Sequence, residues 1–162
     1  MRRVISIDPG SVVAGYAVLD KSGSTIKRVT SGVIRCGKLP FAERLAVIYD
    51  RVAEVCATHH PNEGAIEAIF FQKNAQSALK LGHARAAAML AMVHAGLTVA
   101  EYEPSLVKKT VTGRGAADKA QVAAMVAALI GFRDAATADE SDALAIGLCH
   151  LQQNLLMPRG AR

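Results

Sequence analysis

The sequence has few of the residues that define disulfide-stabilised, zinc-binding or membrane-spanning proteins. Its 162 residues include only three cysteines, no tryptophan and 4% aromatic residues. Cys36, Cys56 and Cys149 lie far apart, so neither a disulfide framework nor a zinc ribbon is predicted. The apolar stretches are interrupted well before the roughly 20 residues that cross a bilayer. We therefore expect a cytoplasmic protein whose thiols are reduced and mostly buried.

The composition that remains is typical of one globular domain. Hydrophobic residues make up 51% of the chain, which is enough for a substantial core. The formal net charge of +5 is compatible with a nucleic-acid partner but does not require one. We predict a single domain over residues 1–156 and a basic, disordered tail over residues 157–162.

Residue patterns along the chain predict a mixed α/β fold. Short runs of apolar and β-branched residues predict strands at 4–7, 12–19, 25–35, 65–70 and 97–102. Apolar periodicity and helix-forming composition predict helices at 41–59, 75–95, 104–112, 117–130 and 139–153. A three-strand meander followed by alternating helices and strands indicates a mixed central sheet with helices on both faces.

Four carboxylates stand where a charge is costly unless it has a partner. Asp8 ends the apolar strand at 4–7, and Glu67 lies inside an apolar run. Asp139 and Asp142 open the last helix, where a spacing of three puts them on one face. If that helix packs beside the strand ends, the four side chains converge. Hard oxygen donors then favour Mg²⁺ or Mn²⁺, and two such ions would support hydrolysis of a phosphodiester.

Each of these acids also has a structural explanation. Asp8 could satisfy the amides of an Asp-Pro-Gly turn, and Glu67 could lie on the polar face of an edge strand. Asp139 could favour the helix dipole beside a capping box formed by Thr137 and Glu140. Glu140 adds a fifth carboxylate to which the sequence assigns no role. Only the four acids together argue for a metal-dependent nuclease.

Four ordered stretches of the chain read IDPGSVVAGYAV, AIEAIFFQKNAQSALKLGHARAAA, VKKTVTGRGAADKAQV and ADESDALAIGLCH. They resemble the successive signature blocks of the RuvC family of bacterial Holliday-junction resolvases. The resemblance implies a ribonuclease-H-like fold and a homodimer that nicks four-way junction DNA with Mg²⁺ or Mn²⁺. It assigns the catalytic, metal-binding acids to Asp8, Glu67, Asp139 and Asp142. It also implies cooperation with the RuvA and RuvB branch-migration proteins.

Basic residues that could hold DNA gather after Glu67 and around the TGRG stretch. By resemblance, Lys108 and Lys119 are catalytic lysines near the scissile phosphate, and Phe70 is the aromatic residue that stacks in the junction. For a single lysine the alternative is a solvated helix face, and for Phe70 it is core packing. The predicted DNA contacts are Phe70, Lys73, Lys80, Arg85, Lys108, Lys109, Arg114 and Lys119.

The helix expected at 75–95 carries a smooth apolar surface that could be buried in the core or pair with a second copy. That surface comprises Ala86, Ala87, Ala88, Met89, Leu90 and Met92. We expect it to form a two-fold interface, which suits paired nicks on a symmetric junction. His83, on the same helix, stands where the family has a neutral polar residue, and it could be structural or contact phosphate or a partner.

Two other functions remain open from the sequence. An Asp-Gly turn between two strands also resembles the phosphate loop of actin-like ATPases. Those proteins need two such domains around the nucleotide, and this chain has the length of one. A metal-free, structure-specific DNA-binding protein would retain the acids as structural residues.

Overall fold

The computed structural model describes residues 1–68, 74–132 and 137–153. In this part of the chain the strands are β1 (Arg2–Asp8), β2 (Val13–Ser22), β3 (Thr25–Arg35), β4 (Glu63–Glu67) and β5 (Thr98–Tyr102). The helices are α1 (Phe41–His59), α2 (Ala75–His94), α3 (Pro104–Thr112), α4 (Lys119–Ile130) and α5 (Ala138–Gln152).

The five strands form one mixed sheet in the order β3-β2-β1-β4-β5. The hairpin partners β1–β2 and β2–β3 are antiparallel, whereas β1, β4 and β5 are parallel to one another. Because parallel strands end at the same edge of a sheet, Asp8 and Glu67, the last residues of β1 and β4, lie at one edge.

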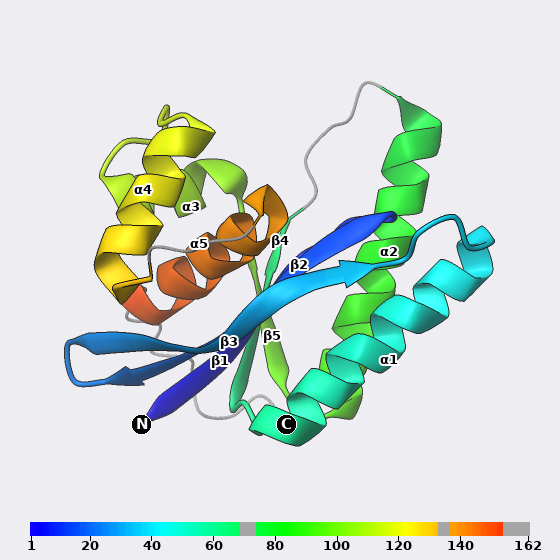
Figure 1. Cartoon of the computed structure of the whole chain (residues 1–162), viewed down its shortest axis with the longest axis horizontal. Helices are drawn as coiled ribbons and strands as arrows, with labels where there is room; N and C mark the ends of the chain where they lie inside the picture. The colour runs from blue at the N-terminus through cyan, green and yellow to red at the C-terminus, as the bar shows by residue number, and fades with distance from the viewer. Residues whose placement is uncertain (69–73, 133–136, 154–162) are drawn as a thin grey trace.

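Helices cover both faces of the sheet, as the sequence predicted (Figure 1). The helices α1 and α2 pack on one face, over a cluster that includes Ile5 and Ile7. The helices α3, α4 and α5 pack on the other, over a cluster that includes Val4 and Leu144. Alternate residues of β1 therefore enter opposite cores, which is why this central strand is apolar on both sides.

Helix α5 lies unusually close to the sheet because small residues separate the two. The buried hydroxyl of Ser6 in β1 donates a hydrogen bond of 2.7 Å to the carbonyl oxygen of Ala143. A Cβ atom on Gly147 would lie 2.7 Å from that same hydroxyl oxygen. The position of α5 over β1 is thus fixed by contacts that leave no room for additional side-chain atoms.

Several element boundaries differ from the sequence predictions. Strand β4 begins at Glu63 rather than residue 65, because its parallel pairing with β1 starts at the Val4–Glu63 pair. It ends at Glu67, which is therefore at the strand end rather than inside the strand. Helix α4 begins at Lys119, since Asp118 is its N-cap in a capping box with Gln121.

Some predictions cannot be compared with this structure. The strand expected to continue to residue 70 enters residues 69–73, and the predicted tail spans 157–162; both stretches lie outside the described residues. The three cysteines are free and buried, as expected. Among the described helices, none is both long and apolar enough to span a membrane.

A buried polar network joins α5 to β4 and β5. The imidazole of His150 lies 2.7 Å from the Glu63 carboxylate through Nε2 and 2.8 Å from the Tyr102 hydroxyl through Nδ1. Arg2 forms two hydrogen bonds, of 2.8 and 2.6 Å, with the same carboxylate. The Arg2 bonds are the main reason that the pKa of Glu63 falls from 4.5 to about 2.

Candidate active site

The four acids selected from the sequence line a single cavity of about 300 Å³ at the edge where β1 and β4 end. Asp8 and Glu67 come from the ends of those adjacent strands, and Asp139 and Asp142 come from the first turns of α5. Lys108 of α3 and Lys119 at the start of α4 line the same cavity. The structure therefore brings the four acids together around one cavity, as expected, and places the two lysines beside them.

Gly15 of β2 explains how α5 reaches Asp8. It is the cross-strand partner of Asp8, and a Cβ atom on it would lie 1.9 Å from the carbonyl oxygen of Asp139. The first turn of α5 can approach Asp8 only because position 15 carries no side chain. The sequence reasoning missed this residue, although a glycine inside a strand is a known signal of close backbone approach.

The start of α5 is fixed by capping and by one buried acid. The hydroxyl of Thr137, the N-cap residue, accepts a 3.2 Å hydrogen bond from the N–H of Glu140. The Glu140 carboxylate is buried and accepts a hydrogen bond from the Ser31 hydroxyl of β3. The Nη1 atom of Arg28 donates to that hydroxyl in turn, at 3.0 Å. The fifth carboxylate thus binds the sheet through β3.

One lysine forms an ion pair with an acid of the cavity. The Nζ atom of Lys119 lies 3.0 Å from Oδ2 of Asp142, forming an ion pair across the cavity. This hydrogen bond is the main reason that the pKa of Lys119 is raised. Lys119 is well placed for it because Asp118 caps α4 immediately before, so the lysine is the first residue of the helix.

Ionisation of the carboxylates that line the cavity is unfavourable. The pKa of Asp8 rises from 3.8 to about 8, first because the carboxyl is buried and then because Glu67, Asp142 and Asp139 face it. Lys119 opposes that rise. Burial and Asp142 also raise the pKa of Glu67. Carboxylates this close cannot all be ionised at neutral pH unless a cation compensates their charge.

These side chains fit a hard divalent cation by chemistry, although they do not yet enclose one. Within residues 1–68, 74–132 and 137–153, no three acidic, histidine or cysteine side chains are grouped closely enough to hold an ion. The acids instead line the walls of the cavity, and Lys119 is bonded to Asp142. All four donors are carboxylates, which Mg²⁺ and Mn²⁺ prefer, and the half-buried Asp8 needs nearby positive charge to ionise at neutral pH.

The other residues predicted to contact DNA are more dispersed. Lys80 on α2, Lys109 on α3 and Arg114 after α3 are exposed, and Arg114 lines a separate cavity of about 470 Å³. Arg85 is directed inward, where its Nε atom donates a 3.0 Å hydrogen bond to the carbonyl oxygen of Glu67. Phe70 and Lys73 lie outside the described residues.

Comparison with known proteins identifies the chain's relatives. The family described as "Crossover junction endodeoxyribonuclease RuvC" matches residues 4–150. The protein of that name from Maricaulis maris is 52% identical over 149 residues, covering 91% of this chain and 89% of the relative. The one from Halorhodospira halophila is 49% identical over 151 residues, covering 93% and 90% of the two chains.

Solved structures agree with the sequence relatives. The structure described as "T. thermophilus RuvC in complex with Holliday junction substrate" has a TM-score of 0.87 and 34% identity, with 93% of each chain covered. A second T. thermophilus RuvC structure has a TM-score of 0.83 at the same identity. The predicted ribonuclease-H-like fold is confirmed by this likeness. The chain therefore belongs to the RuvC family of crossover junction endodeoxyribonucleases.

Proposed function

We propose that this protein is a structure-specific endonuclease that resolves Holliday junctions in DNA recombination and repair. It cleaves by paired, symmetric, metal-dependent hydrolysis that leaves 5′-phosphate and 3′-hydroxyl ends. The observation that carries the proposal is the position of Asp8, which is half-buried at a strand end and faces three further carboxylates. Membership of the RuvC family supports the same activity.

Asp8, Glu67, Asp139 and Asp142 would hold the cations, two of Mg²⁺ or Mn²⁺ in each subunit. When bound, such ions supply the positive charge that stabilises the attacking and leaving oxygens of a phosphodiester. The strand ends and the first turns of α5 fix the carboxylates before substrate arrives. Water attacks phosphorus in line, and the bond from phosphorus to the 3′ oxygen breaks.

Lys119 and Lys108 would neutralise charge that develops on the phosphate. Lys119 is paired with Asp142, with its Nζ atom 3.0 Å from Oδ2, and so compensates the charge of one acid. The Lys119 ammonium would turn from that carboxylate toward the phosphate of a bound substrate. Its side chain is 77% exposed, which leaves it free to turn.

The wider DNA surface would be formed by the exposed basic residues around the cavity. Lys80, Lys109 and Arg114 can each reach solvent, as phosphate contacts require. The family resemblance adds Phe70 as the junction-stacking residue and Lys73 as a further contact.

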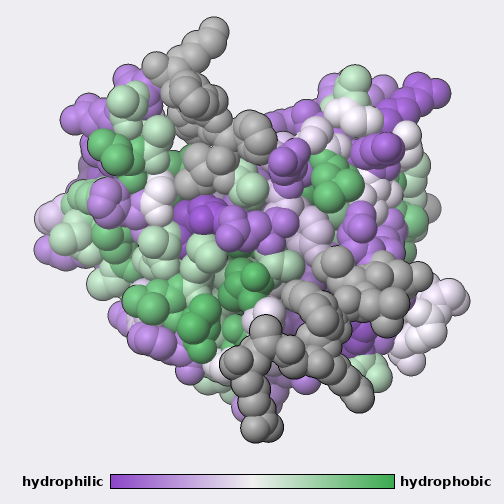
Figure 2. All heavy atoms as spheres, turned by 180° about the vertical axis from the view of Figure 1, so that it is seen from behind, coloured by the Kyte–Doolittle hydropathy of each residue, from purple (hydrophilic) through white to green (hydrophobic). Residues whose placement is uncertain are grey.

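We also propose that the protein is a homodimer formed through α2. Ala88 and Met92, which the sequence placed on the candidate interface, are buried in the core. The large hydrophobic residues that α2 exposes are Leu79, Leu90 and Val93, whose spacing puts them on one side of the helix. Seen from behind, hydrophobic residues gather on the side of the molecule where α2 lies (Figure 2). A symmetric pair of α2 helices would cover this stripe.

Further parts of the proposal rest on the family. Cooperation with RuvA and RuvB would deliver the junction to the dimer. The described segments all pack on one sheet, which supports a single nuclease domain over 1–156 followed by a basic tail. A cytoplasmic location fits three free, buried thiols and a chromosomal substrate.

The activity is tested with a labelled four-way junction, a duplex and a single strand, each with and without Mg²⁺. Asp8→Asn should abolish nicking while junction binding stays within a few-fold of wild type. Asp118→Asn is the matched control, because this exposed acid precedes Lys119 and asparagine caps a helix equally well. Cleavage by Asp8→Asn in Mg²⁺ would overturn the proposal.

The same assay separates the two alternatives. A protein that binds the junction but never nicks it with Mg²⁺ or Mn²⁺ would be a structure-specific binder with structural acids. Saturable ATP binding in the absence of DNA would instead support an actin-like nucleotide site.

A further inference from the structure

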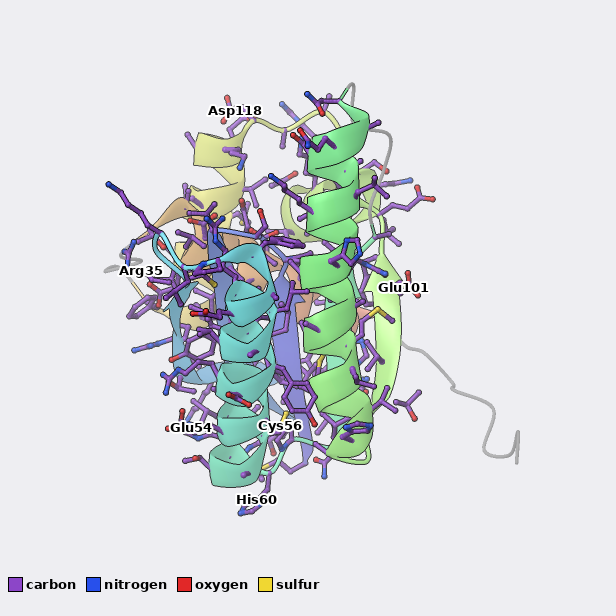
Figure 3. The ribbon with its side chains drawn as sticks, turned by 90° about the vertical axis from the view of Figure 1, so that its right-hand side faces the viewer. Arg35, Glu54, Cys56, His60, Glu101 and Asp118 are labelled. Atoms are coloured by element: carbon purple, nitrogen blue, oxygen red, sulfur yellow. The ribbon has the colours of Figure 1, made fainter. Side chains whose placement is uncertain are left out.

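Arg85 of α2 is engaged in two contacts inside the protein. Its Nε atom donates a 3.0 Å hydrogen bond to the backbone carbonyl oxygen of Glu67, and its Nη2 atom pairs with the Glu101 carboxylate of β5. Glu101 lies beside α2 at the side of the sheet (Figure 3). The Arg85 side chain is only 15% exposed. One planar guanidinium thus links α2 to the ends of two strands.

The Glu67 carbonyl group lies where the pairing of β4 with β1 ends. The pairing of β4 with β1 ends at Ile66 and Ile7, one residue before Glu67. On the other side, β5 still holds the chain, since the N–H of Ala68 donates a 2.8 Å hydrogen bond to the carbonyl oxygen of Tyr102. Arg85 therefore supplies a donor at the first residue that has lost its β1 partner.

We propose that Arg85 is a positioning residue that fixes the backbone of Glu67 and thereby aims its carboxylate into the metal cavity. The inference rests on the proposed function, because it assigns Glu67 to the metal. The guanidinium suits this role, since its rigid fork can hold a carbonyl and a carboxylate at once. Changes in groups that orient a metal ligand typically alter metal affinity or activity by roughly 10- to 100-fold.

This assignment competes with the prediction that Arg85 contacts DNA phosphate. The guanidinium is mostly buried and its charge faces the Glu101 carboxylate, so a phosphate contact would require leaving both partners. The two roles differ in measurable ways. A phosphate contact depends on the positive charge of Arg85 and contributes to the salt dependence of DNA binding. A positioning role depends on the forked shape of the guanidinium and affects metal binding even when DNA is absent.

The first experiment measures Mn²⁺ binding by electron paramagnetic resonance in the absence of DNA. Arg85→Gln and Arg85→Lys should both weaken Mn²⁺ binding by about tenfold or more, since lysine keeps the charge but not the fork. Arg51→Gln is the matched control: Arg51 is also paired with a glutamate, on the exposed surface of α1, and its change should leave Mn²⁺ binding unchanged. Wild-type Mn²⁺ affinity in both Arg85 variants would overturn the inference.

The second experiment measures junction binding over a range of salt concentrations in Ca²⁺ or EDTA. The slope of log affinity against log salt should be the same for Arg85→Gln and wild type. A slope reduced by about one in Arg85→Gln and restored in Arg85→Lys would make Arg85 a phosphate contact and overturn the inference.

If Arg85→Gln does not fold, Glu101→Gln provides the test. Glu101 is about half exposed, so its loss leaves the core intact but removes one of the two contacts of the Arg85 guanidinium. Mn²⁺ binding should weaken about two- to fivefold, and an unchanged affinity would overturn the inference. A wild-type protein that binds Mn²⁺ but cuts no junction would refute the proposed function alone. One that binds no Mn²⁺ would refute both.

Discussion

The backbones of Gly15 and Asp139 approach so closely beside the acid cluster that the sheet has room for α5 only as long as position 15 lacks a side chain. Gly15→Ala should push the first turn of α5 away from Asp8. We expect a loss of about 1–3 kcal/mol in unfolding free energy and a roughly 100-fold slower single-turnover cleavage rate. Denaturant unfolding and junction cleavage measure the two effects.

The control for that change is Gly32→Ala on the neighbouring strand β3. The three atoms nearest to its added Cβ would all belong to the Tyr16 side chain, with the hydroxyl oxygen nearest at 3.0 Å, and a side chain can move where a backbone cannot. Cleavage should stay near the wild-type rate. Equal loss of activity in both variants would show that the Gly15–Asp139 contact is not what positions α5.

Asp8→Asn should stabilise the metal-free protein at alkaline pH. The pKa of Asp8 is raised from 3.8 to about 8 in the folded state, so its contribution to stability is complete below pH 3.8 and is lost as pH rises through 8. Asparagine has no charge to bury. In EDTA the variant should melt at nearly the wild-type temperature at pH 4. At pH 8.5 the unfolding free energy of the variant should exceed that of wild type by at least about 1 kcal/mol. A difference that shrank with rising pH would contradict this.

Glu63→Gln should remove part of the acid sensitivity of the fold. The pKa of Glu63 is lowered from 4.5 to about 2, so its stabilisation is complete above pH 4.5 and disappears as pH falls toward 2. Between pH 4.5 and about 2, the unfolding free energy of wild type should fall by about 3 kcal/mol more than that of the variant. Urea unfolding measures the difference. Glu54→Gln, which alters an exposed pair on α1, should keep the wild-type profile.

Leu90→Lys should separate the proposed dimer. Leu90 is 49% exposed in the middle of the apolar stripe on α2, so a charge there would be buried on both sides of a two-fold axis. Light scattering after size exclusion should show a monomer with a wild-type fold. Met125→Lys on α4 is the control, since Met125 is a similarly exposed apolar residue on another face. A Leu90→Lys variant that remained dimeric would place the interface elsewhere.

The sequence was sufficient to predict that the four acids lie around one cavity and to place most helices and strands, because both leave strong local signals. Asp8 interrupts an apolar strand, and the spacing of Asp139 and Asp142 fits one face of a helix. Strand pairing is not local, so the start of β4 at Glu63 could not be predicted from an exposed-looking Pro-Asn-Glu-Gly stretch. The same limit applies to Met92, for which the sequence left both a core position and the candidate interface open, and which the structure places in the core.

Contacts made by single side chains were less predictable still. A basic residue that follows a candidate metal-binding acid suggests a DNA contact, but only the structure shows the Arg85 guanidinium against the Glu67 carbonyl oxygen. The role of Gly15 likewise depends on a helix more than 120 residues later in the chain. The hydrogen bond from the Ser31 hydroxyl to Glu140 joins residues that no local pattern relates.

Helix α5 supplies two of the four acids that line the cavity, and it is the last helix of the described chain. Asp8 and Glu67 are synthesised early, on β1 and β4, whereas Asp139 and Asp142 follow only after the five described strands. A chain that ended before α5 would therefore carry only two of the four acids that line the cavity.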